Sequence, residues 1–177
     1  MKGGVTSVMN EYKENTLYAR IGESLIKKED CLDYIREHEI RIRYLESNKP
    51  AGKSKRVKLG ECRMIKEKTK DMFRALGFKE EEIPDFVIVI YKERIFGFHP
   101  EQLRILIMHE LMHIGVKEDS ETGEITLHTA KHDLEDFRYI IEQFGTGWAD
   151  DRNQITWQQV QEAFQNVDEE TGEIMEG

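Results

Sequence analysis

One stretch of the sequence constrains the fold more than any other, the run from Leu103 to Val116. It is apolar at nearly every position, which predicts a helix buried on all sides. Apart from Arg104 near its start, three polar residues, His109, Glu110 and His113, interrupt the run. Burying such groups without partners is costly in free energy. The fold must therefore place this helix where the three side chains share a common partner.

The spacing of these residues indicates what that partner is. His109 and His113 are four positions apart, so both imidazoles project from one helix face, about 6 Å from each other, and can bind one tetrahedral ion. Glu110 lies about 100° further round the helix and can reach a water on that ion. Zinc lowers the pKa of its water toward about 7, and a carboxylate can move the proton to a leaving amine. The run thus fits the H-E-x-x-H pattern, with Glu110 as general base. Two core histidines bonded to backbone, with an incidental glutamate, are the competing interpretation.

A catalytic zinc site has three protein ligands and one open position. Candidates for the third ligand lie downstream, at His128, His132 and Glu135. We expect His132, because an amphipathic run follows it and predicts a helix over about 130–144 whose first turn faces the metal. His128 and Glu135 remain as alternatives.

The rest of the chain predicts an α+β fold. Residues 40–46 alternate apolar and polar groups, and residues 86–91 are a continuous β-branched and aromatic run, so both read as strands. The second of these could offer an edge to an extended peptide. Two short helices are expected within 11–40, and one helix over 59–76 that ends at Gly77. The motif helix is expected from Pro100 to about Ile114, where Gly115 ends it. A polar loop over 117–125 follows, and a last helix is expected near 157–164.

These elements predict a small β-sheet packed on the buried motif helix, with flanking helices. We expect an N-terminal extension over 1–19, one catalytic domain over 20–150, and a C-terminal helix with an acidic tail over 151–177. A chain of 177 residues suits one such domain.

Composition limits the kinds of molecule that we expect the protein to bind. A net charge of −9 argues against nucleic-acid binding by the surface as a whole. Residues 49–58 are the exception, with five basic residues in ten. No apolar run approaches the roughly 18 residues of a membrane span, and residues 1–5 lack the apolar stretch of a secretory signal. We therefore expect a cytoplasmic protein without membrane contact.

On these residues the chain resembles the phage metallopeptidase family, which is itself similar to the SprT and Spartan group of zincin proteases. The similarity spans roughly residues 20–148. It rests on the blocks Arg41–Leu45, Leu59–Cys62, Asp85–Tyr91, Gln102–Gly115 and His132–Phe137, followed by Gly145 and Trp148.

The resemblance implies a zincin-like α+β domain in which His109, His113 and His132 bind zinc. One departure stands out from the SprT pattern, in which the third histidine precedes a glycine and an aromatic residue. Here Asp133 follows His132, and Phe137 comes five positions after it.

The predicted function is hydrolysis of peptide bonds by a zinc-dependent metallopeptidase acting on a protein or peptide. An enzyme for another amide or an ester would carry the same motif. The alternative of a different class is a non-catalytic zinc-stabilised module that binds nucleic acid or a DNA-associated protein through residues 49–58. The fourth metal position separates the two, because an enzyme keeps it open and a structural site closes it, here with His128 or a carboxylate.

Overall fold

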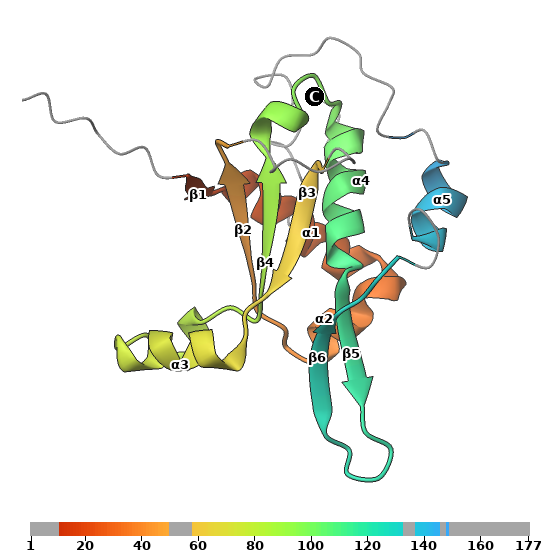
Figure 1. The fold of residues 1–177 in the computed structure, drawn as a ribbon. Helices are drawn as coiled ribbons and strands as arrows, with labels where there is room; N and C mark the ends of the chain where they lie inside the picture. The colour runs from red at the N-terminus through yellow and green to blue at the C-terminus, as the bar shows by residue number, and fades with distance from the viewer. Residues whose placement is uncertain (1–10, 50–57, 133–136, 146–147, 149–177) are drawn as a thin grey trace, which may run out of the picture.

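Strands and helices are interspersed along the residues that the computed structural model describes, which are 11–49, 58–132, 137–145 and 148. They form two small sheets with helices beside them, so the α+β prediction is confirmed (Figure 1). The strands are β1 (Tyr12–Glu14), β2 (Ile42–Ser47), β3 (Gly60–Met64), β4 (Phe86–Tyr91), β5 (Ile114–Glu118) and β6 (Ile125–Thr129). The helices are α1 (Thr16–Lys28), α2 (Asp33–Glu37), α3 (Glu67–Ala75), α4 (Pro100–Leu111) and α5 (Arg138–Phe144).

Strand β4 is the strand around which the larger sheet is built. It pairs parallel with β2 and antiparallel with β3, and β1 joins the far side of β2, giving the order β1-β2-β4-β3. Phe86, Ile88 and Ile90 pack against α1 and α4, whereas Val89 and Tyr91 are buried on the opposite face. Both edges of β4 are covered, so the prediction that it offers an edge to a peptide is wrong.

The prediction of a single helix over 59–76 is wrong. This stretch forms strand β3 and then helix α3, because residues 60–64 pair with β4 and satisfy their backbone groups on that strand. The partner is distant in the sequence, so the local spacing of apolar residues does not reveal it. Helix α3 buries none of its residues, and in Figure 1 it stands apart from the other helices.

Helix α4 begins where the sequence predicts but ends earlier. Pro100 occupies the first turn, and the N–H of the N-cap His99 donates to the side-chain oxygen of Gln102 at 2.8 Å. The helix ends at Leu111 and closes with a tighter bond from His113 N to Glu110 O, 3.2 Å long. His113 therefore lies in the last turn, just past the regular helix.

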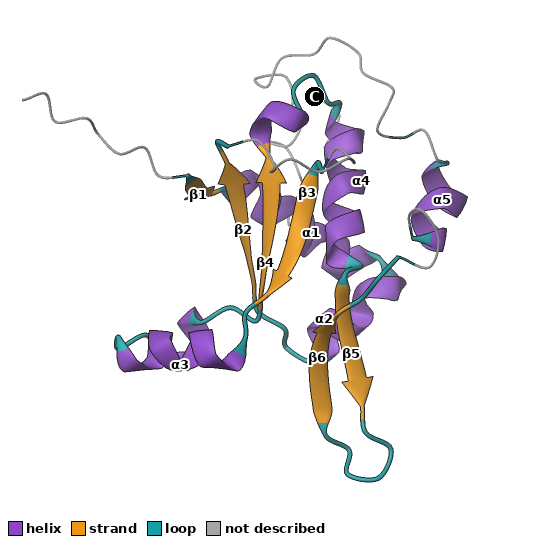
Figure 2. Ribbon diagram, in the orientation of Figure 1, coloured by secondary structure: helices purple, strands orange, loops and turns teal. Residues whose placement is uncertain are grey.

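A β-hairpin follows α4 in place of the predicted helix stop at Gly115 and the loop over 117–125. Strands β5 and β6 pair antiparallel, with Gly115 opposite His128, and extend away from the end of α4 (Figure 2). The imidazole of His128 lies over Gly115, where a Cβ atom would come within 2.4 Å of it. The glycine is needed for this close approach and not as a helix terminator.

The helix predicted over 130–144 is shorter than expected. The chain leaves β6 without regular structure at residues 130–132, and α5 begins only at Arg138. His132 therefore lies before the helix and not in its first turn. The predicted helix near 157–164 and the tail over 151–177 lie outside the described residues, and the domain boundaries stay a prediction.

Ordered structure begins before residue 20, since β1 joins the sheet and Tyr18 of α1 is fully buried. Within the described ranges, no helix is long and apolar enough to cross a membrane.

Candidate metal centre

Three histidines that are distant or helically spaced in the sequence converge at the C-terminal end of α4. The Nε2 atom of His132 lies 3.1 Å from Nε2 of His109 and 3.1 Å from Nε2 of His113. One ring nitrogen from each residue falls within 4.8 Å of the others. Nitrogens bound at about 2.0–2.1 Å to a tetrahedral zinc ion lie roughly 3.4 Å apart, and three neutral imidazoles are a donor set that zinc accepts. The three side chains thus fit a single ion of this kind.

Hydrogen bonding to Ala130 orients one of these rings. Nδ1 of His113 donates to the carbonyl of Ala130 at 2.8 Å, because a carbonyl can only accept. This bond leaves Nε2 without its proton and directed at the other two imidazoles. The backbone N–H of Ala130 donates in return to the carbonyl of His113 at 2.7 Å. The chain after β6 is thereby held against the last turn of α4.

An aromatic ring supports the three histidines together. The ring centroid of Phe137 lies 5.4 Å from that of His109, 4.8 Å from that of His113 and 5.0 Å from that of His132, each close to edge-on. Phe137 itself is buried and is the N-cap of α5. This packing restricts the orientation of all three rings.

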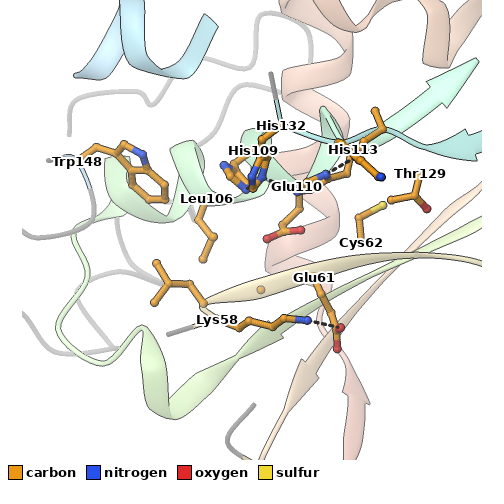
Figure 3. Close-up of a pocket in the computed structure, with 14 residues that line it drawn as sticks. Lys58, Glu61, Cys62, Leu106, His109, Glu110, His113, Thr129, His132 and Trp148 are labelled. Atoms are coloured by element: carbon orange, nitrogen blue, oxygen red, sulfur yellow. Dashed lines mark hydrogen bonds and ion pairs between the residues drawn. The ribbon is translucent and has the colours of Figure 1, made fainter. Parts of the chain in front are cut away.

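Glu110 lies on the inner side of the histidines, between α4 and the sheet. Its side chain is buried, and Figure 3 shows the carboxylate directed toward β3. A Cβ atom at Gly60 of β3 would lie 3.0 Å from Oε1 of Glu110 and 3.0 Å from the carbonyl oxygen of Val89. The carboxylate is therefore placed against a strand position that only glycine leaves open.

A cavity of about 610 Å³ opens beside these groups. Its lining combines the motif residues with β3, the end of β6 and Trp148, as Figure 3 shows. Cys62 of β3 is part of the lining, and burial, together with the charge of Glu110, raises the pKa of its thiol. Cys62 is thus a neutral group at physiological pH. The cavity is large enough for several atoms of a peptide beside the histidines.

The alternatives for the third ligand fall in different places. His128 lies in β6 with its exposed ring over Gly115, and it is not a member of the histidine group. Glu135 lies outside the described residues, as do positions 50–57 of the basic segment. Among the candidates that the structure describes, His132 is the one that joins His109 and His113.

Sequence reasoning missed several residues of the site. Ala130 acts through its backbone, which no residue type can signal. Gly60 falls in a segment predicted to be helical, although a glycine inside an amphipathic pattern is itself a sign of close backbone approach. Gln102 and Trp148 contact each other across 46 positions, through a hydrogen bond from the Gln102 amide to the Trp148 carbonyl.

Comparison with known families gives one match. The sequence model of the family described as "putative phage metallopeptidase" matches residues 10–165. The match takes in the sheet, α4, all three histidines and Trp148. Searches of curated proteins and of solved structures found no significant match.

Proposed function

The chain belongs to the phage metallopeptidase family, and from that premise we propose that it is a zinc-dependent peptidase of the H-E-x-x-H type with a zincin-like active site. The family implies a metal and a protein or peptide substrate. One observation carries the finer assignment. Three imidazole nitrogens converge beside the buried Glu110 at the wall of an open cavity.

In this proposal His109, His113 and His132 hold the metal, and Glu110 moves protons. A bound zinc ion would polarise the substrate carbonyl and lower the pKa of a water toward about 7. Glu110 accepts a proton from the attacking water and later delivers it to the leaving amine. Its burial strengthens each charge interaction it makes, and its place against Gly60 restricts the directions it can take.

An enzyme is favoured over a structural zinc module by what surrounds the histidines. His128, which would close the fourth position of a structural site, turns instead toward Gly115. Among the described residues the group has three members, and a cavity adjoins it. An open position next to a cavity is the arrangement that a hydrolase requires.

The substrate backbone has a place to bind at β3. The N–H of Tyr91 donates to the carbonyl of Leu59, and the N–H of Ile65 donates to the carbonyl of Asp85. In an antiparallel pair, bonded and non-bonded positions alternate, so the backbone groups of Gly60 and Cys62 point away from β4. Within the described ranges β3 pairs with β4 alone. We infer that an extended peptide pairs with Gly60 and Cys62 along this edge.

Metal analysis and proteolysis on matched variants test the assignment. We expect zinc in the wild type, in Glu110→Gln and in His128→Ala, and its loss in His109→Ala and His132→Ala. Cleavage of a peptide library should fall by about 10²–10⁴ in Glu110→Gln and stay near the wild-type rate in His128→Ala. Full activity in Glu110→Gln, or zinc loss in His128→Ala with retention in His132→Ala, would contradict the proposal.

Backbone methylation of a substrate tests pairing with β3. In a peptide that binds zinc-loaded Glu110→Gln, N-methylation at alternate positions should weaken binding by about tenfold, because each removes one hydrogen bond at the edge of the strand. Methylation at the intervening positions should change the dissociation constant little. Equal effects at all positions would rule out strand pairing.

A further inference from the structure

One face of α4 extends from the histidines toward the start of the helix. Gln102, Leu106, His109 and His113 follow one another at spacings of four, three and four residues, so they share a face. Leu106 lies one turn before His109 and lines the same cavity. The apolar part of the cavity wall therefore begins next to the metal centre.

Trp148 forms the wall beyond Leu106. Its indole centroid lies 6.4 Å from that of His109, at an interplanar angle of 45°. Figure 3 shows Trp148 and Leu106 on the side of His109, and Cys62 and Thr129 on the other side, near His113. Leu59, just before β3, also lines the cavity. The side of the cavity next to His109 is thus lined by Leu106 and Trp148, and we call these two residues together with Leu59 the apolar recess.

A buried amide holds Trp148 in this position. Gln102 is 6% exposed, and its Nε2 donates to the carbonyl of Trp148 at 2.9 Å. Its Oε1 accepts from the N–H of His99 at 2.8 Å, within the cap of α4. Because the two bonds use opposite ends of the amide, Gln102 connects the backbone of Trp148 to the start of α4.

We infer that the apolar recess selects a large apolar side chain, aromatic or branched aliphatic, at one of the two substrate positions that flank the scissile bond. Leu59, Leu106 and Trp148 give it no charged group, and the ammonium of Lys58, which lines the same cavity, pairs with Glu61 at 3.7 Å. A charged side chain would therefore lose its hydration there without an unpaired partner. The recess adjoins His109, so a side chain in it belongs to a residue next to the reacting carbonyl. Trp148 determines specificity, and Gln102 is a positioning residue. The inference rests on the proposed peptidase function.

The test maps cleavage sites and compares variants. Wild type, Trp148→Ala, Gln102→Glu and Leu76→Ala are incubated with a peptide library, and mass spectrometry gives the residues that flank each cleaved bond. Gln102→Glu keeps the oxygen that accepts from His99 and suits the first turn of a helix, but it cannot donate to Trp148. Leu76, the C-cap of α3, is 74% exposed and serves as the control.

We expect wild type and Leu76→Ala to prefer large apolar residues by about tenfold or more over Ala and Asp at one flanking position. In Trp148→Ala and Gln102→Glu the preference should fall below about threefold, while zinc content stays close to wild type and shows that both variants fold. Undiminished preference in Trp148→Ala would overturn the role of Trp148. A preference retained in Gln102→Glu would overturn the positioning role of Gln102.

Binding separates this inference from the proposed function. Fluorescent peptides that contain either Phe or Ala at the flanking position tested above are titrated against zinc-loaded Glu110→Gln. If wild type cleaves nothing but Phe binds more tightly, and Trp148→Ala in the same background removes the difference, the apolar recess stands and the peptidase proposal fails. If wild type cleaves peptides with no apolar preference, the recess assignment fails and the peptidase proposal stands.

Discussion

Gly60 shows how a single residue without a side chain can confine a neighbouring carboxylate. A Cβ at this position would meet Oε1 of Glu110, the carbonyl of Val89 and the end of Ile90 at 2.9–3.0 Å. The backbone carbonyl cannot move without disturbing the pairing of β3 with β4. The added atom would therefore displace Glu110, the more flexible neighbour.

Replacing Gly60 with alanine should reduce turnover and leave the metal in place. A displacement of well under 1 Å at Glu110 is expected to lower kcat by about tenfold to hundredfold, with zinc content unchanged because the histidines are untouched. Peptide cleavage and metal analysis measure the two effects. Gly115→Ala is the matched control, since the nearest neighbour of its Cβ is the exposed ring of His128, which can rotate. Equal rates in Gly60→Ala and wild type would show that Glu110 is not confined by β3.

Among the elements, the β5–β6 hairpin brings His132 to the two histidines at the end of α4. It reverses the chain after His113 and returns it at Ala130, next to the end of the helix. The hydroxyl of Tyr34 in α2 anchors the start of β5 by donating to the carbonyl of Ile114 at 2.8 Å. Burial raises the pKa of Tyr34 to about 12, so it remains a donor at neutral pH. The hairpin thus determines where His132 lies.

Loss of one backbone bond at the end of the hairpin should weaken metal binding. Ala130→Pro removes the N–H that donates to His113, and proline suits the extended chain that follows a strand. We expect zinc affinity to fall by about 10–100-fold, as for other changes to groups that orient ligands. Ala130→Gly keeps the N–H and should bind zinc within a few-fold of wild type. Competition with a chromophoric chelator measures both, and equal affinity in the two variants would contradict the role of the bond.

At the scale of the whole molecule, the site lies where three parts of the chain meet. Strand β3 supplies the inner wall, α4 supplies His109 and Glu110, and the segment after β6 supplies His132. A metal held by all three histidines would connect α4 to that segment and bind only the folded chain tightly. Metal binding should therefore be linked to global stability.

Removal of metal should lower the melting temperature. At free zinc of about 100 times its dissociation constant, the expected stabilisation is about 2.7 kcal/mol, or about 5–10 °C for a chain of this size. Calorimetry with and without a chelator measures it. His132→Ala should melt at the same temperature in both conditions. An unchanged melting temperature in the chelated wild type would mean that the histidines bind no metal in the folded state.

Local patterns in the sequence account for the motif helix and the central strand. The spacing of His109 and His113, the proline at position 100 and the apolar run over 86–91 act within one helix turn or one strand, so the sequence is sufficient to predict α4 and β4. The choice of His132 over His128 also came from local signals. His132 is the histidine that lies beside His109 and His113 in the structure, although the helix expected to carry it begins only at Arg138.

The sequence by itself determined which residues can bind a metal and which segments are buried, because helical and strand periodicity are properties of neighbouring residues. Only the tertiary structure decided that residues 60–64 form an edge strand, that Ala130 orients His113, and that Gln102 holds Trp148 beside His109. These contacts join residues far apart in the chain. They depend on backbone groups and on the absence of a Cβ at Gly60. The identity of neighbouring residues in the sequence does not predict contacts of this kind.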